Sequence, residues 1–180
     1  MLKVFDSAVT MSEFPDEITL CVNISNCPGT CEECSEPWLR EDVGEELTEE
    51  KIDSLIAEHP GITVFGLMGG DSDHKDVIRI ANYVHRAHPG MKVGMYSGRD
   101  FINLELAQVL DLYKIGRWIP PKGDKSEWLK KSWGPLQFPN SNQLLFEKVG
   151  HFMLNTTDKF RRNPLGDLSS YIITDSKIDD

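Results

Sequence analysis

A strand–loop–helix unit recurs along most of the chain and sets the main limit on its fold. Two of the helical stretches end in the same way, at His59-Pro-Gly and His88-Pro-Gly. Apolar, strand-like stretches alternate with them, at residues 17–24, 62–68, 91–96 and 112–115. Strands separated by helices are expected to pair in parallel through right-handed crossovers. The pattern therefore predicts an α/β fold with a mostly parallel sheet.

Helix signals lie between these strands. Thr48-Glu-Glu-Lys and Asp71-Ser-Asp each precede apolar residues at helical spacing, and a shorter helix is expected at 103–110. A complete eight-unit βα barrel typically needs about 250 residues, and this chain has 180. We therefore expect a partial (βα) barrel whose cleft is open at the side.

The remaining segments suggest one domain with a trailing extension. Residues 123–139 are polar, rich in lysine and interrupted by proline, which is typical of a loop or insertion. Residues 143–146 and 152–154 flank Gly150 and predict a hairpin. We expect a domain over residues 1–155 and a C-terminal extension over 156–180 that is partly disordered.

Three cysteines lie within eight residues, in the sequence Cys27-Pro-Gly-Thr-Cys31-Glu-Glu-Cys34. Their spacing, C-x3-C-x2-C, places three thiolates on one short loop directly after the first expected strand. Such a loop can bind three irons of a cubane cluster and leave the fourth iron without a protein ligand. A protein that only carries electrons normally supplies a fourth Cys. The spacing therefore indicates a [4Fe-4S] cluster with one iron open to a substrate.

A structural zinc site is the alternative for these cysteines. Zinc usually takes two Cys-x2-Cys pairs, or Cys together with His, whereas only Cys31 and Cys34 form such a pair in this sequence. Cys21 precedes Cys27 by six residues and is a possible fourth ligand. Its place inside an expected strand favours a small buried residue instead, because free Cys is among the most buried residue types.

A second group of candidate residues follows the next two expected strands. Gly69, Gly70 and Asp71 come directly after one strand, and Ser97-Gly-Arg comes after the next. Ligands of α/β sheets bind at the carboxyl ends of parallel strands. Two glycines allow a close approach to a ligand, and a carboxylate can accept a hydrogen bond from an ammonium group. We take Gly69, Gly70, Asp71 and Ser97 as candidate cofactor-binding residues, although Asp71 in such a turn can also be a plain helix cap.

The charge and composition of the chain argue against some classes of function. The formal net charge is −10 and the pI is about 4.9, which opposes binding to nucleic acid or to an anionic membrane surface. No apolar run approaches the length that spans a bilayer, and the N-terminus lacks the pattern of a signal peptide. We therefore expect a cytoplasmic protein whose four cysteines stay reduced.

Several segments together resemble the radical S-adenosylmethionine (SAM) superfamily, and more narrowly the anaerobic ribonucleoside-triphosphate reductase activating proteins. The resemblance runs from about residue 16 to 146, in matching order. The segments are Asn23-Ile-Ser-Asn-Cys-Pro-Gly-Thr-Cys-Glu-Glu-Cys, Phe65-Gly-Leu-Met-Gly-Gly-Asp, Met95-Tyr-Ser-Gly-Arg, Tyr113-Lys-Ile-Gly-Arg and Ser141-Asn-Gln. The small size also fits this branch of the superfamily.

The resemblance implies a cofactor set and a ligand for each part of it. Cys27, Cys31 and Cys34 would hold a [4Fe-4S] cluster, and the amino and carboxylate groups of SAM would chelate the open iron. Residues 69–71 would take the place of the family's Gly-Gly-Glu segment, which binds the SAM amino group, with Asp71 one methylene shorter than Glu. Glu33 departs from the aromatic residue that many members carry before the third Cys, so adenine must be held differently.

The resemblance also implies an activity. A one-electron donor such as flavodoxin or ferredoxin would reduce the cluster, SAM would be cleaved reductively, and the resulting radical would take a hydrogen atom from a glycine of the reductase. Cofactors carry this chemistry, so no side chain is expected to act as a general base.

Two other functions stay open at this point. The chain can instead activate a different glycyl-radical enzyme, or be a non-catalytic zinc-binding module. Residues 122–139, which include Trp128 and Trp133 among lysines, are either part of a surface for the partner protein or a solvated insertion.

Overall fold

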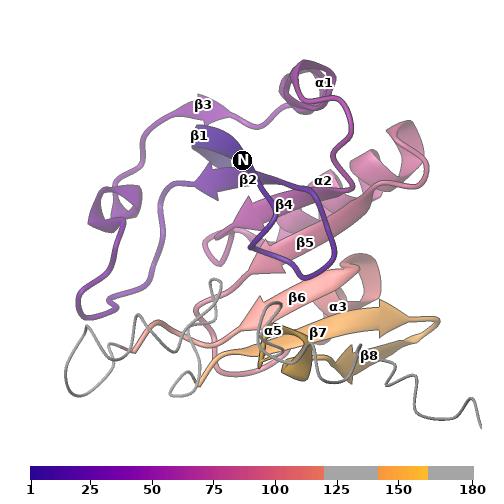
Figure 1. The fold of residues 1–180 in the computed structure, drawn as a ribbon. Coiled ribbons are helices and arrows are strands. Elements are labelled where there is room, and N and C mark those ends of the chain that lie inside the picture. The colour runs from indigo at the N-terminus through magenta and orange to yellow at the C-terminus, as the bar shows by residue number, and fades with distance from the viewer. Residues whose placement is uncertain (120–141, 162–180) are drawn as a thin grey trace, which may run out of the picture.

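The computed structural model of the chain describes residues 1–119 and 142–161. Within these residues eight strands form one sheet, in the order β3-β1-β2-β4-β5-β6-β7-β8 (Figure 1). The strands are β1 (Lys3–Thr10), β2 (Thr19–Ile24), β3 (Glu45–Glu46), β4 (Val64–Met68), β5 (Lys92–Tyr96), β6 (Leu112–Ile115), β7 (Leu144–Val149) and β8 (Phe152–Asn155). The expected segment 123–139 lies outside the described residues.

Parallel pairing occupies the centre of the sheet. β2 pairs with β4, β4 with β5 and β5 with β6, all in parallel, as the recurring strand–helix unit predicts. Antiparallel pairs lie on both sides: β3 and β1 beside β2, and β7 and β8 beside β6. Four of the seven pairs in the described sheet are thus antiparallel, so the parallel arrangement is confined to the centre, and a partial barrel stays a prediction.

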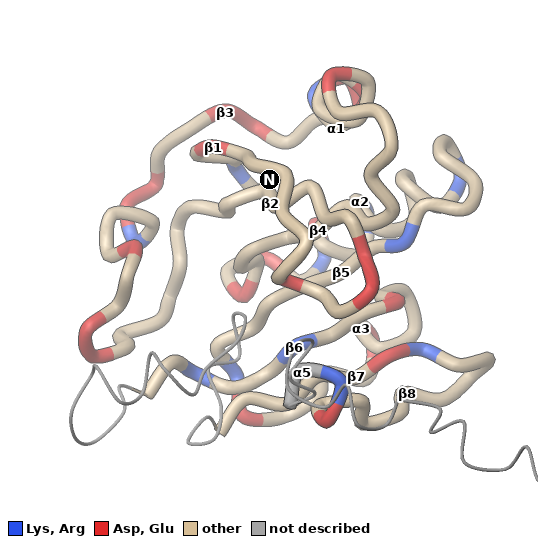
Figure 2. Tube along the Cα trace, viewed as in Figure 1, with Lys and Arg blue, Asp and Glu red and all other residues tan. Residues whose placement is uncertain are grey.

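The apolar sequence of β4 explains its central position. Its five residues, Val-Phe-Gly-Leu-Met, include no charged side chain, and Figure 2 shows this strand without the charges that line the surrounding loops. Val64, Phe65 and Leu67 are fully buried. Strands that are covered on both faces have such continuous apolar runs, because neither face meets water.

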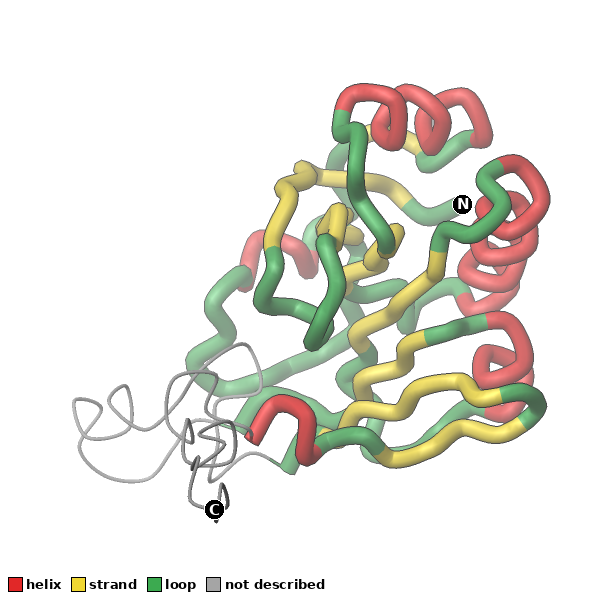
Figure 3. The backbone as a smooth tube through the Cα atoms, turned by 45° about the vertical axis from the view of Figure 1, so that its right-hand side comes forward, coloured by secondary structure: helices red, strands yellow, loops and turns green. Residues whose placement is uncertain are grey.

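Three helices cover one face of the sheet. They are α1 (Glu49–Glu58), α2 (His74–Ala87) and α3 (Leu104–Val109), and all three lie on the same side of the strands (Figure 3). The Thr48 side chain accepts a 3.2 Å hydrogen bond from the Lys51 amide, which confirms the N-terminal signal of α1. Ile52 of α1 and Val77, Ile80 and Val84 of α2 are buried in the main core. Two short helices, η1 (Pro37–Arg40) and α5 (Asp158–Arg161), lie outside this layer.

A segment between β1 and β2 packs against the opposite face. Phe14 is fully buried there and meets Tyr96 edge-on, with ring centroids 5.2 Å apart. Gly94 makes room for this ring, since a Cβ on Gly94 would lie 2.5 Å from Phe14 Cε2. Lys114 lies over the other ring of the pair, 3.8 Å from the Tyr96 centroid, and burial lowers the pKa of its ammonium to about 7. This face is therefore occupied by the chain itself.

The recurring strand–helix pattern of the sequence does not predict β1. Val4, Phe5, Val9 and Thr10 are residues that favour strands, but β1 is not followed by a helix and so falls outside the recurring unit. The strand runs antiparallel to β2 and brings Leu2 and Val4 into the main core.

The described C-terminal residues continue the sheet. β7 and β8 form the expected hairpin around Gly150, whose φ is 61°. Beyond the expected domain boundary at residue 155, the amide of Leu145 donates to Thr157 Oγ1 and Lys159 forms an ion pair with Glu147 at 2.7 Å. Residues 156–159 therefore pack with β7. In the described part of the chain, no helix combines the length and the apolar character needed to cross a bilayer.

Candidate metal centre

The cysteine loop follows β2 and is held in place by η1. The Cys27 amide donates to the Leu39 carbonyl at 2.8 Å, and the Arg40 guanidinium donates to the Cys31 carbonyl at 2.9 Å. The Asn26 amide also donates to the Glu41 carbonyl at 2.9 Å. Because these bonds engage the main chain of the loop at two of its cysteines, the side chains of Cys27 and Cys31 stay available for other ligands.

Gly29 provides the space between two of the thiols. A Cβ on Gly29 would lie 3.3 Å from Cys27 Sγ and 3.8 Å from Cys31 Sγ, so the two sulfurs are at most about 7 Å apart. The Gly29 amide also donates to Cys27 Sγ at 3.4 Å. A side chain at this position would fill the volume between the sulfurs. The loop thus leaves space between these two sulfurs and directs one backbone donor, the Gly29 amide, at Cys27 Sγ.

Two residues of the loop have left-handed backbone conformations that non-glycine residues rarely adopt. Asn26, just before Cys27, has φ 59°, and Glu33, just before Cys34, has φ 49°. Asn tolerates this region, whereas Glu does so at a cost of about 1 kcal/mol or more. The turns at these two positions bring the chain into and out of the cysteine loop.

The thiols of the loop influence one another. Burial raises the pKa of Cys27, and nearby Asp71, Cys31 and Cys34 raise it further, while the Gly29 amide lowers it. Metal-binding thiols are deprotonated, so a cationic metal would offset this mutual repulsion. Cys21 is different: burial and the carboxylates of Glu13 and Glu36 raise its pKa to about 12. Cys21 is buried within β2, with 7% of the residue exposed, as its position in the sequence predicts.

Gly69 and Gly70 shape the turn after β4. Both have positive φ values, 117° and 113°. A Cβ on Gly70 would lie 2.9 Å from Val77 Cγ2, and a Cβ on Gly69 would lie 3.3 Å from the Ile24 carbonyl oxygen. These close approaches, together with the φ values, explain why two glycines occur in succession. The turn brings the next residue, Asp71, to the carboxyl edge of the sheet.

Asp71 connects the ends of two strands. Its Oδ1 accepts a hydrogen bond from Ser97 Oγ and its Oδ2 accepts one from the Gly98 amide, both at 2.7 Å. Asp73, not Asp71, is the N-cap of α2, because the Asp76 amide donates to Asp73 Oδ1. The interpretation of Asp71 as a plain helix cap is therefore wrong.

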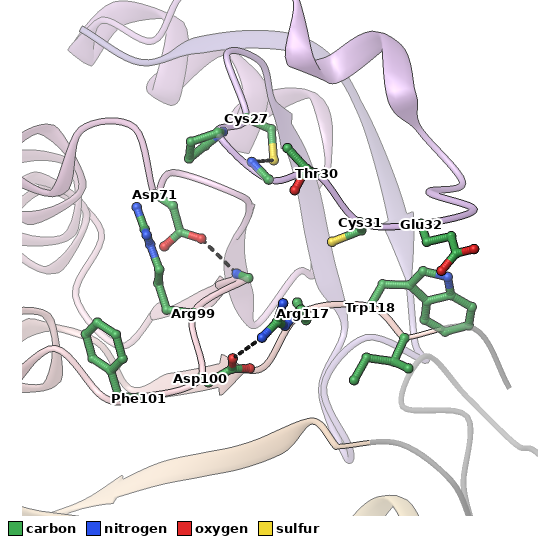
Figure 4. A pocket seen from close by; sticks show the side chains of 14 residues that line it. Cys27, Thr30, Cys31, Glu32, Asp71, Arg99, Asp100, Phe101, Arg117 and Trp118 are labelled. Atoms are coloured by element: carbon green, nitrogen blue, oxygen red, sulfur yellow. Dashed lines mark hydrogen bonds and ion pairs between the residues drawn. The ribbon is translucent and has the colours of Figure 1, made fainter.

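The cysteine loop and the strand ends line one cleft. Its volume is about 560 Å³, within the range of small-molecule sites. In Figure 4, Cys27 and Cys31 face the cleft from one wall, and Arg99, Asp100 and Arg117 line the other. The remaining lining residues are Pro28, Gly29, Thr30, Glu32, Asp71, Gly98, Phe101, Trp118 and Ile119. Arg117 and Asp100 of that second wall form an ion pair of 3.1 Å.

The structure thus brings most of the candidate residues together. Cys27, Cys31 and Asp71 line the cleft, Ser97 joins it through Asp71, and Cys34 is half-buried at the end of the same loop. Gly69 and Gly70 shape the turn that positions Asp71 and do not themselves line the cleft. Phe101 and Trp118 also line the cleft and were not among the predicted site residues. Their positions in the sequence could have indicated this role, because Phe101 follows the Ser97-Gly-Arg segment closely and Trp118 comes directly after Tyr113-Lys-Ile-Gly-Arg.

A single-ion site has different requirements from a cluster. In the described ranges 1–119 and 142–161, no three His, Cys, Asp or Glu side chains are placed to hold one metal ion. In a cubane cluster each thiolate binds its own iron, so the sulfurs need not converge on one point. The donor set of three thiols on one loop fits such a cluster.

Comparison with protein-family models decides the class of this centre. The model of the 4Fe-4S single cluster domain matches residues 18–124, which is more than half of the chain. The chain belongs to this family. The matched range begins just before β2 and includes the cysteine loop, Asp71 and the cleft residues that follow β5 and β6. No curated protein and no solved structure matches the chain in the corresponding comparisons.

Proposed function

We propose that this 4Fe-4S single cluster domain is a radical SAM activating enzyme that generates a glycyl radical on anaerobic ribonucleoside-triphosphate reductase. The observation that carries the proposal is the common cleft of Cys27, Cys31 and Asp71. A cluster that lacks one protein ligand needs a second, separate group of residues to bind whatever occupies its open iron. Asp71 and Arg99, which line the same cleft as Cys27 and Cys31, support this assignment.

Three thiols are assigned to the cluster. Cys27, Cys31 and Cys34 each bind one iron, and η1 holds the loop that carries them. When bound, such a cluster supplies the single electron that cleaves SAM reductively. The buried thiol of Cys21 takes no part, because its raised pKa and its position in β2 keep it protonated and inaccessible.

Asp71 is assigned to the ammonium group of SAM. Its side chain is 8% exposed and borders the cleft. The Ser97 hydroxyl and the Gly98 amide each use one lone pair of the carboxylate, which leaves further lone pairs for a cationic donor. The shorter side chain of Asp, compared with Glu, is fixed at the edge of the sheet by these two bonds.

One aromatic residue of the cleft is assigned to adenine. Phe101 and Trp118 line the same cleft as the cysteines, and aromatic faces bind nucleobases by stacking, which is worth about 1–3 kcal/mol per base. Phe101 and Trp118 lie at opposite ends of the cleft (Figure 4), so only one of them can stack on the adenine. That residue would compensate for Glu33, which stands where many radical SAM enzymes carry an aromatic side chain.

A partner protein must present its glycine to this cleft. The cleft is lined by the cysteine loop and residues 98–101 at the carboxyl edge of the sheet, and a loop of the second protein would bring its glycine to this edge. The proposed docking role of residues 122–139 concerns a segment outside the described residues.

Electron paramagnetic resonance tests the proposal. The protein is reconstituted anaerobically with iron and sulfide and mixed with the reductase of the same organism, SAM and dithionite. We expect a glycyl-radical doublet on the reductase. If 5′-deoxyadenosine forms without that doublet, the partner is wrong and another glycyl-radical enzyme is indicated. If the protein instead holds one zinc per chain without iron or labile sulfide, the proposal fails.

A further inference from the structure

A chain of hydrogen bonds behind Asp71 begins at Asn103. Asn103 is the N-cap of α3, and its Oδ1 accepts hydrogen bonds from the amides of Glu105 and Leu106, at 2.9 and 3.1 Å. These two bonds fix which side of the amide group is oxygen. The Nδ2 group of Asn103 must therefore point the other way, as a donor.

The donor group of Asn103 determines the tautomer of His74. Asn103 Nδ2 lies 3.2 Å from His74 Nδ1. Because the amide nitrogen can only donate, His74 Nδ1 must accept, and the imidazole proton is on Nε2. An imidazolium would place a second N–H at Nδ1, opposite the N–H of Asn103. The arrangement thus favours a neutral imidazole.

The Nε2 proton faces Asp71. His74 Nε2 lies 3.6 Å from Asp71 Oδ1, slightly beyond hydrogen-bond distance. The Nε2 atom is buried, and it has no hydrogen-bond partner among the described residues. A buried donor without a partner is unfavourable, and a small shift of either side chain would complete the bond. Asp71 would then have three donors from its own chain.

A neutral donor and a charged one would affect Asp71 differently. A neutral imidazole orients the carboxylate and leaves its negative charge for a ligand. An imidazolium at the same place would form an ion pair with Asp71 and compete with any incoming cation.

We propose that His74 is a positioning residue that holds Asp71 as a charged acceptor for the ammonium group of the bound ligand, and that Asn103 keeps His74 in the neutral form this requires. The inference rests on the proposed function, since it deepens the role of Asp71 in that site. It assigns ammonium recognition to three elements: the turn after β4, the start of α2 and the cap of α3.

The substitution Asn103→Asp tests this directly. Asp is as good an N-cap as Asn, so α3 is preserved, but its carboxylate would accept a hydrogen bond from a protonated Nδ1 and so favour an imidazolium. The matched control is Asn103→Ser, which also caps the helix and introduces no charge. Dissociation constants of the reconstituted proteins are measured at pH 7.5 by equilibrium dialysis for SAM, methionine and 5′-deoxyadenosine.

The three ligands separate positioning from a general loss of structure. We expect Asn103→Asp to weaken SAM and methionine binding by about tenfold, since an ion pair with His74 would replace the charge-assisted bond to the ligand. Binding of 5′-deoxyadenosine, which has no ammonium group, should be unchanged. Asn103→Ser, which loses the donor to His74 Nδ1 but adds no charge, should weaken SAM and methionine by less, about threefold, and leave 5′-deoxyadenosine unchanged. Equal weakening of all three ligands by Asn103→Asp, or no weakening of methionine, would overturn the inference.

Nitrogen NMR of ¹⁵N-histidine-labelled protein gives a readout that does not depend on any ligand. We expect the His74 signals of a neutral ring protonated at Nε2 in the wild type, and of an imidazolium in Asn103→Asp. A wild-type His74 that is protonated at Nδ1 would contradict the inference even if SAM binds. Conversely, wild-type protein that holds its cluster but binds no SAM would refute the proposed function, while the NMR result would still decide the state of His74.

Discussion

The cysteine inside β2 is buried, whereas the cysteines of the loop that follows β2 are exposed or half-buried. Cys21 lies in the strand, 7% exposed, with a pKa raised to about 12 by burial and by neighbouring carboxylates. Six residues later the loop presents Cys27, Cys31 and Cys34 at the surface or half-buried. The comparison shows that burial, not residue type, decides which thiols are available to bind a metal.

The same contrast extends across the sheet. In the interior of the central strands, side chains pack into the core, and glycines such as Gly94 make room for neighbours. At the carboxyl edge, Asp71 and Ser97 form hydrogen bonds to each other and border a cleft. The packed interior therefore fixes the positions of the edge where the proposed chemistry would take place, and each of the following predictions tests one side of this contrast.

The largest effect is expected from the loop cysteines. Replacing Cys27, Cys31 or Cys34 with Ala should reduce the iron and labile sulfide of the reconstituted protein to a small fraction of the wild-type content, because each thiolate binds its own iron. Cys21→Ala is the matched control and should retain the full content. If Cys21→Ala loses iron as completely as the other three variants, the buried strand cysteine and the loop cysteines do not differ in metal binding.

A smaller effect is expected from the charge of Asp71. Asp71→Asn can still accept from the Gly98 amide and donate to Ser97 Oγ, so the contact between β4 and β5 is kept. Loss of a charge-assisted hydrogen bond costs roughly 1.5–3 kcal/mol, which is about a tenfold to hundredfold loss of SAM affinity. Equilibrium dialysis with labelled SAM measures this, and iron analysis should show an unchanged cluster. Unaltered SAM binding would mean that Asp71 only connects the strands.

Gly70 tests the backbone at the same edge. Gly70→Ala forces a Cβ onto a residue with φ 113° and places it 2.9 Å from Val77 Cγ2. We expect a loss of about 1–3 kcal/mol in the free energy of unfolding, measured by urea titration. Gly61→Ala is the control, because Gly61 has φ 92° but nothing within 4 Å of its Cβ position. A loss no larger than that of the control would show that Val77 accommodates the methyl group.

The smallest effect concerns the ionisation of Cys21. Its thiol has a pKa near 9 when the chain is unfolded and about 12 when folded, so the folded state favours the protonated form. Stability from this group is therefore complete below pH 9 and falls as the pH rises toward 12. Between pH 8 and 10 the wild type should lose about 1 kcal/mol more than Cys21→Ala, in urea titrations at both pH values. Equal losses would place the thiol in contact with solvent.

Local signals predicted much of the fold and of the site. The strand–helix alternation gave β2, β4, β5 and β6 and their parallel pairing, because each helix requires a crossover in one direction. Cysteine spacing identified the loop, since its donors lie within eight residues. The carboxyl ends of parallel strands meet at one edge, which was enough to bring Asp71 and Ser97 together.

The features that sequence did not predict depend on distant contacts. β1 was missed because its place beside β2 is decided by pairing and not by a local repeat. That Asp73 caps α2 while Asp71 binds Ser97 and Gly98 depends on the geometry of the Gly69–Gly70 turn. Likewise, the approach of Asn103 to His74, 29 residues apart, follows from the packing of α3 beside α2.

The central claim is that three loop thiols hold a cluster whose fourth iron is open to SAM. Its most direct test is the yield of 5′-deoxyadenosine from anaerobically reconstituted protein supplied with SAM and dithionite, in wild type, Cys21→Ala and Cys31→Ala. The account predicts that wild type and Cys21→Ala form 5′-deoxyadenosine at similar rates and that Cys31→Ala forms none above the background without protein. Iron-loaded wild-type protein that leaves SAM intact, or a Cys21→Ala protein as inactive as Cys31→Ala, would contradict it.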